Sequence, residues 1–118
     1  GMLSSRIAYA LNLKGPNMVI DTACSSGLVA IHTACSALRN KECGMAVAGG
    51  INILVYPKAA NVMEEIEAEG ADVRPFSRNA SGTVWGEGVG ALILKPLSKA
   101  ISDNNRILGV IKGSAEQW

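Results

Sequence analysis

A long uncharged stretch constrains this chain more than any other feature. Residues 22–38 contain no aspartate, glutamate, lysine or arginine. Hydrophobic side chains recur within them at helical spacing: Leu28, Ile31, Cys35 and Leu38. A helix without a charged face is buried on all sides or lies in a membrane, and the serines, threonines and histidine here are too polar for lipid. The sequence therefore predicts a central helix over about residues 24–40, covered all round.

The chain is too short to supply that cover by itself. It has 118 residues, of which 48% are hydrophobic and 18% charged, and a formal net charge of +1. Such a composition excludes a disordered chain. The balanced charge gives no basic surface for nucleic acid or an anionic membrane, so neither partner is expected. We expect instead a piece of a larger protein.

Strand and helix patterns alternate along the sequence. We expect helices over residues 3–11, 24–40, 57–70 and 97–101, and strands over residues 18–20, 45–55, 89–94 and 107–111. The glycines within residues 45–55 indicate a strand that passes close to another backbone. This alternation predicts an α/β fold with buried strands.

Cys24 is the candidate catalytic residue. It lies where an apolar segment turns into the uncharged helix, and such a turn exposes a nucleophile at its apex. A helix N-terminus favours the thiolate over the thiol, and small neighbours leave room for an acyl chain. The alternative is an ordinary buried cysteine, as most cysteines are.

The remaining cysteines and the single histidine fit structural roles better. Cys35 lies on the apolar face of the predicted helix and Cys43 in the turn after it. His32 follows Cys24 along the same helix at about 12 Å, given a rise of 1.5 Å per residue, which exceeds hydrogen-bond reach. A nucleophilic Cys24 therefore needs bases from outside this chain.

Two other patterns point to no cofactor or metal site. Residues 86–91 imitate the dinucleotide-binding glycine pattern, but they run into a predicted strand, whereas that fingerprint must open a helix. The acidic cluster of Glu64, Glu65, Glu67 and Glu69 is interpreted as a solvated helix face. Three cysteines form neither a disulfide framework nor a zinc pattern, so we expect free thiols and a cytoplasmic protein.

Residues 21–26 (Asp-Thr-Ala-Cys-Ser-Ser) resemble the active-site signature of the β-ketoacyl synthases, specifically the ketosynthase domains of modular polyketide synthases. The similarity extends over nearly the whole chain, through residues 5–16, 46–52, 74–76, 82–90 and 110–115. The family commonly has a third serine at Gly27, an aspartate at Ser77 and an acid near Ser81. Residues 116–118 also depart from its pattern, which continues with an asparagine and a glycine.

The resemblance implies a thiolase-like fold, layered α-β-α-β-α and made of two similar halves. Residues 1–118 would form a partial ketosynthase domain: the later part of the N-terminal half and the first strand of the C-terminal half. The strand before Cys24 resembles the strand through which the family dimerises. The family's two catalytic histidines and conserved lysine would lie in the absent half, which implies an inactive isolated fragment.

The same resemblance implies an acyltransferase with Cys24 as nucleophile. Cys24 would take an acyl chain from the 4′-phosphopantetheine arm of an acyl carrier protein, and a malonyl-type thioester would then attack it after decarboxylation. No cofactor would bind directly to the chain. Two alternatives remain: a non-elongating or inactive fragment that only binds or transfers acyl groups, and a condensing domain of a fatty-acid synthase.

Overall fold

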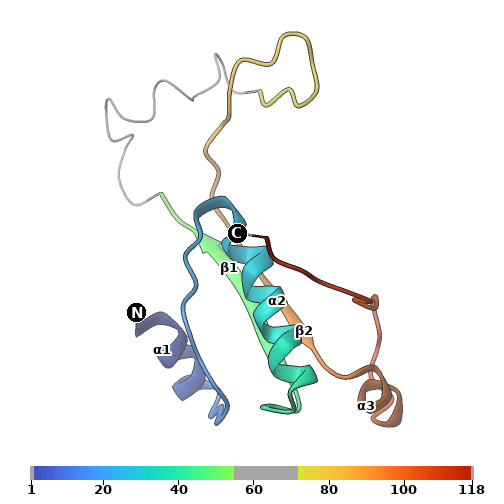
Figure 1. Ribbon diagram of the computed structural model, residues 1–118. Coiled ribbons are helices and arrows are strands. Elements are labelled where there is room, and N and C mark those ends of the chain that lie inside the picture. The colour runs from blue at the N-terminus through green and yellow to red at the C-terminus, as the bar shows by residue number, and fades with distance from the viewer. Residues whose placement is uncertain (1, 55–71, 118) are drawn as a thin grey trace. The chain divides into compact units, whose positions relative to one another are not determined.

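The computed structural model describes residues 2–54 and 72–117 of the chain. Its elements, in order, are α1 (Met2–Ala10), the 3₁₀ turn η1 (Ala23–Ser25), α2 (Ser26–Arg39), β1 (Ala46–Asn52), β2 (Gly88–Leu94) and α3 (Leu97–Ser102), as Figure 1 shows. The predicted helix over residues 57–70, with its acidic cluster, lies outside the described residues. No helix in the described part is long and apolar enough to cross a membrane.

The chain divides into two compact units. One comprises Gly1–Gly50 with Gly90–Trp118, and the other comprises Ile51–Val89. The boundary between the units falls within both strands. The three described helices and the turn that carries Cys24 belong to the first unit.

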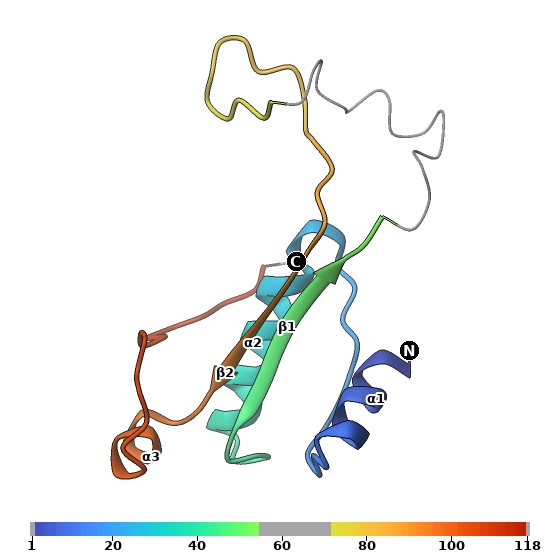
Figure 2. The ribbon, with the colours of Figure 1, turned by 180° about the vertical axis from the view of Figure 1, so that it is seen from behind.

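The two strands pair into a two-stranded sheet, in which they run antiparallel (Figures 1 and 2). This confirms the strands predicted over residues 45–55 and 89–94, and it also explains the glycines. A Cβ atom built on Gly49 would lie 2.7 Å from the carbonyl oxygen of Gly90, closer than real side chains approach a backbone. Gly49 therefore permits the close pairing of β1 with β2.

Helix α2 lies on one side of the strand pair, in front of it in Figure 1 and behind it in Figure 2. The described residues bury only small hydrophobic side chains: Ala8 of α1, Cys35 of α2, Ala48 of β1 and Ala100 of α3. Cys35 is thus a packing residue, as predicted. The expected cover on every side of α2 is not supplied by the described residues, because Leu28 remains 74% exposed.

The three described helices end with the same backbone motif. Asn12, Lys41 and Asn104, with φ values of 52°, 60° and 51°, adopt the left-handed conformation just beyond the last turn. In each case the amide of the following residue donates a hydrogen bond to the carbonyl five residues earlier, as the Leu13 amide does to the Ala8 carbonyl at 2.8 Å. This is the Schellman motif. The first helix therefore ends at Ala10, one residue before the end predicted from the sequence.

The strands predicted over residues 18–20 and 107–111 are wrong. Both segments lack regular structure in this chain, because a strand is defined by a hydrogen-bonded neighbour and β1 and β2 pair with each other. Met18 and Val110 are 56% and 52% exposed, which fits apolar segments without a partner strand. Each segment has the apolar pattern of a strand, but the pairing that a strand requires is absent from the described residues.

Replacing Gly49 with alanine should destabilise the sheet. The new methyl group would press against backbone that cannot move aside, so we expect the free energy of unfolding to fall by about 1–3 kcal/mol. Urea denaturation measures the loss. Gly50→Ala is the matched control, because nothing lies within 4 Å of a Cβ at Gly50. Equal effects of the two substitutions would contradict the assigned contact.

Lys95, Lys99 and Asp103 form a charge cluster at the end of α3. The Asp103 carboxylate accepts hydrogen bonds from the ammonium groups of Lys99, at 2.7 Å, and of Lys95, which also donates to the side-chain oxygen of Asn105 at 2.8 Å. Hydrogen bonding to Lys95 and then Lys99 lowers the pKa of Asp103 from 3.8 to about 2. The carboxylate therefore stays ionised well below neutral pH.

The lowered pKa of Asp103 predicts how the stability contributed by this cluster changes with pH. The stabilisation from this cluster should be fully present above pH 3.8 and should be lost as the pH falls toward 2, where the folded state takes up the proton. Carbon-detected NMR titration of the Asp103 carboxyl measures its pKa directly. A measured pKa of Asp103 at or above 3.8 would refute the assignment.

Candidate active site at the start of helix α2

Cys24 lies in the middle of η1, which leads directly into the first residue of α2. Cys24 is an exposed residue. The turn into a helix predicted from the sequence is therefore present, although the segment before it is irregular and forms no strand. Cys24 thus occupies the N-terminal edge of a helix, where backbone N–H groups have no partner within the helix.

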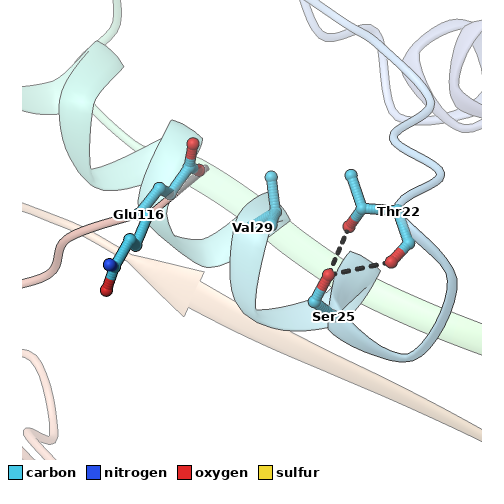
Figure 3. Close-up of a pocket in the computed structure, with 5 residues that line it drawn as sticks. Thr22, Ser25, Val29 and Glu116 are labelled. Carbon is cyan, nitrogen blue, oxygen red and sulfur yellow. Dashed lines mark hydrogen bonds between the residues drawn. The ribbon is translucent and has the colours of Figure 1, made fainter.

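Two serine hydroxyls brace this turn. The Ser26 hydroxyl accepts a hydrogen bond from the Thr22 amide at 2.8 Å and donates to the Ala23 carbonyl at 2.7 Å. The Ser25 hydroxyl donates to the Thr22 carbonyl at 2.8 Å and lies 2.8 Å from the Thr22 hydroxyl (Figure 3). Asp21 accepts a hydrogen bond from the Ala23 amide at 3.1 Å. Sequence reasoning treated these serines as small neighbours and missed their bonding role.

The backbone of Ala23 is strained. Its φ of 53° is in the left-handed region, which residues other than glycine and asparagine rarely adopt. Such a residue persists only where surrounding contacts hold it, and the bonds to its amide and carbonyl do so here. The strain therefore falls on the residue directly before Cys24.

A cavity of about 250 Å³ borders the turn. Its lining comes from both segments of the first unit: Thr22, Ser25, Val29, Glu116 and Gln117. Figure 3 shows Val29 between the hydrogen-bonded Thr22–Ser25 pair and Glu116, along one side of α2. Thr22 and Ser25 are close to Cys24 in sequence, but Cys24 itself does not line the cavity.

The final segment of the chain is tied to α2 by Ser114. The Ser114 hydroxyl lies 2.9 Å from Nδ1 of His32 and accepts a longer hydrogen bond from Arg39 at 3.5 Å. His32 is half-buried, and Ser114 is its polar neighbour. His32 therefore serves to hold the segment, in keeping with its rejection as a base for Cys24.

The glycine-rich residues 86–91 run into β2, and this confirms the predicted strand. The dinucleotide fingerprint requires a helix at this point instead. Glu87 between these glycines accepts a hydrogen bond from the Leu54 amide at 2.7 Å, and Asn52 donates to the Gly86 carbonyl at 2.5 Å. These contacts lie within the second unit and fasten the strand ends. Among the described residues, no three histidine, cysteine or acidic side chains gather into a metal-binding group.

Comparison with known proteins identifies the family. The profile described as "Beta-ketoacyl synthase, N-terminal domain" matches residues 1–100, and the chain belongs to this family. It is similar to the polyketide synthase PksM of Bacillus subtilis, with 52% identity over 118 residues, covering 98% of this chain and 3% of PksM. It is also 43% identical over 116 residues to a phenolphthiocerol/phthiocerol polyketide synthase protein of Mycobacterium tuberculosis, covering 97% of this chain and 6% of that protein.

A solved structure shows the fold. The ketosynthase from module 6 of the bacillaene synthase of Bacillus subtilis superposes with a TM-score of 0.83 at 45% identity, over 88% of this chain and 19% of that one. The chain is thus part of a thiolase-like ketosynthase fold, which confirms the predicted fold class and the resemblance to polyketide ketosynthases. It spans only 3% and 6% of the two curated relatives.

The strain at Ala23 can be tested by two substitutions. Ala23→Gly should leave the protein at least as stable, because glycine adopts this φ freely. Ala23→Val should lower the free energy of unfolding by about 1–2 kcal/mol, because a β-branched side chain clashes in the left-handed region. Chemical denaturation measures both. Ala80→Val, at an exposed residue without a positive φ, is the control and should change stability little; a similar loss there would rule out strain as the cause.

Proposed function

We propose that the protein carrying this chain is a condensing β-ketoacyl synthase of a polyketide synthase, with Cys24 as its nucleophile. The observation that carries the proposal is an exposed cysteine in a hydrogen-bonded, strained turn at the start of a helix. A helix N-terminus stabilises the negative charge of a thiolate. The named relatives are polyketide synthases, which favours this context over a fatty-acid synthase.

The first step of the proposed mechanism loads the enzyme. The Cys24 thiolate attacks the thioester carbonyl of an acyl group on the phosphopantetheine arm of an acyl carrier protein. The carbonyl oxygen becomes an oxyanion, for which backbone N–H groups at the start of α2, including that of Cys24, are the proposed donors. The carbon–sulfur bond to the carrier then breaks, the carrier thiolate leaves and takes up a proton, and the acyl group remains on Cys24.

The second step forms the carbon–carbon bond. A malonyl-type thioester on a carrier protein loses carbon dioxide, and the resulting enolate attacks the acyl carbonyl on Cys24. That carbon–sulfur bond breaks and returns the Cys24 thiolate. The chain contains a single histidine, His32, which is engaged with Ser114. We therefore propose that the histidines which the family resemblance implies for this step come from outside residues 1–118, and that the isolated chain does not condense.

We also propose where the enzyme forms a homodimer and in which compartment it lies. Residues 18–20 are apolar, with Met18 56% and Val19 51% exposed, and they have no partner strand in the described part of the chain. They are the proposed site of homodimer formation, in line with the family resemblance. Three free thiols fit a reducing cytoplasm.

Acylation of Cys24 is the direct test. Incubating the natural polypeptide with an acyl-pantetheine thioester should add one acyl mass to the peptide containing Cys24, because the thiolate displaces the pantetheine thiol. Cys24→Ala should abolish the adduct, while Cys43→Ala, at a half-buried thiol beyond α2, should retain it. Peptide mass spectrometry measures both. An adduct of undiminished yield in Cys24→Ala would disprove the assigned nucleophile, and acylation without condensation would favour the non-elongating alternative.

A further inference from the structure

We propose that Ser26 is a positioning residue for the acylation of Cys24, because its hydroxyl fixes the peptide group that carries the Cys24 N–H. This inference rests on the proposed function, in which that N–H stabilises the oxyanion of the reaction. It goes further by naming the side chain that aims this donor. Ser26 would act through the backbone and not on the substrate itself.

The Ser26 hydroxyl is fully engaged with the turn before it. It accepts a hydrogen bond from the Thr22 amide at 2.8 Å and donates to the Ala23 carbonyl at 2.7 Å. A serine hydroxyl has a single proton to donate, so that proton is committed to Ala23. The Ser26 amide donates to the same carbonyl. One residue therefore holds the Ala23 oxygen with two donors.

The Ala23 carbonyl and the Cys24 amide belong to one peptide group. This group is planar and trans, so its C=O and N–H bonds point in opposite directions and turn together. A hydrogen bond that holds the Ala23 oxygen therefore also sets the direction of the Cys24 N–H. That direction matters because an oxyanion donor is effective when it is aimed in advance and needs no reorientation during the reaction.

The Cys24 amide is available for this role, whereas the amides around it are occupied. The amides of Thr22, Ala23 and Ser25 donate to a side-chain hydroxyl, a side-chain carboxylate and a backbone carbonyl, at 2.8, 3.1 and 3.3 Å. The Cys24 amide has no acceptor among residues 2–54 and 72–117. The turn thus leaves one N–H unoccupied, on the exposed residue that bears the thiol.

Backbone strain makes the hydroxyl necessary. Ala23 has a φ of 53°, which is unfavourable for alanine, and relaxation to a negative φ would rotate the peptide group that follows. The Cys24 N–H would then lose its direction. The Asp21 carboxylate and the Ser26 amide would still hold Ala23 without the hydroxyl. We therefore expect loss of the hydroxyl to misalign the donor without dismantling the turn.

Two reactions of the same thiol test the inference. Acylation by an acyl-pantetheine passes through an oxyanion, whereas alkylation by iodoacetamide displaces iodide from a saturated carbon and uses no such donor. In the natural polypeptide, Ser26→Ala should slow acylation of Cys24 at saturating thioester by about tenfold or more. The half-saturating thioester concentration and the alkylation rate should change little. Time-resolved mass spectrometry of the peptide containing Cys24 measures both reactions.

Ser102→Ala is the matched control. The Ser102 hydroxyl also donates to a carbonyl three residues earlier, that of Lys99 at 3.0 Å, but it does so in α3. Its removal should leave both rates unchanged. The isosteric pair Ser26→Thr and Ser26→Val repeats the comparison with and without a hydroxyl. Threonine should keep most of the acylation rate, and valine should lose it.

The outcomes separate the inference from the proposed function. Unchanged acylation in Ser26→Ala, or equal acylation in the threonine and valine variants, would overturn the inference alone. Equal losses of acylation and alkylation would also overturn it, because they indicate a disrupted turn and not a misaimed donor. A wild-type protein that is alkylated but never acylated at Cys24 would overturn the proposed function as well.

Discussion

The hydrogen bonds of the Ser26 hydroxyl are the contacts on which the candidate site depends. By joining the amide of Thr22 to the carbonyl of Ala23, this hydroxyl closes a turn in which Ala23 has a positive φ. The helix begins at the same residue, so one side chain both starts α2 and holds the strained backbone before it. The Asp21 carboxylate, which accepts a hydrogen bond from the Ala23 amide, supports the same left-handed alanine next to Cys24.

Helix α2 connects this turn to the rest of the first unit. Its Cys35 is buried, its His32 and Arg39 hold Ser114, and its first turn lines the cavity that Glu116 completes. The absence of charge from Ser26 to Leu38 suits these roles, because contacts on several sides leave little room for ionic groups that prefer water. In the described residues the cover is incomplete, as the exposed Leu28 shows.

Predictions based on periodicity succeeded where the interaction is local or the partner strand belongs to this chain. The helices at the start of the chain, over residues 24–40 and over residues 97–101 are present, and so are β1 and β2. The predicted strands over residues 18–20 and 107–111 are absent, because their apolar pattern specifies a buried segment but cannot supply the neighbour that makes it a strand. Helix α1 ends at Ala10, within one residue of the predicted end, and the left-handed Asn12 follows it.

The sequence by itself determined the helix that lacks charge, the cysteine at its start, the glycine that lets β1 approach β2, and the family to which these residues point. Each depends on residue type and short spacing, which sequence displays directly. Only the tertiary structure decided that Ser114 pairs with His32 and that Glu116 lines the same cavity as Thr22 and Ser25. The physical reason is that these contacts join residues far apart in sequence, and only the path of the folded backbone brings such groups together.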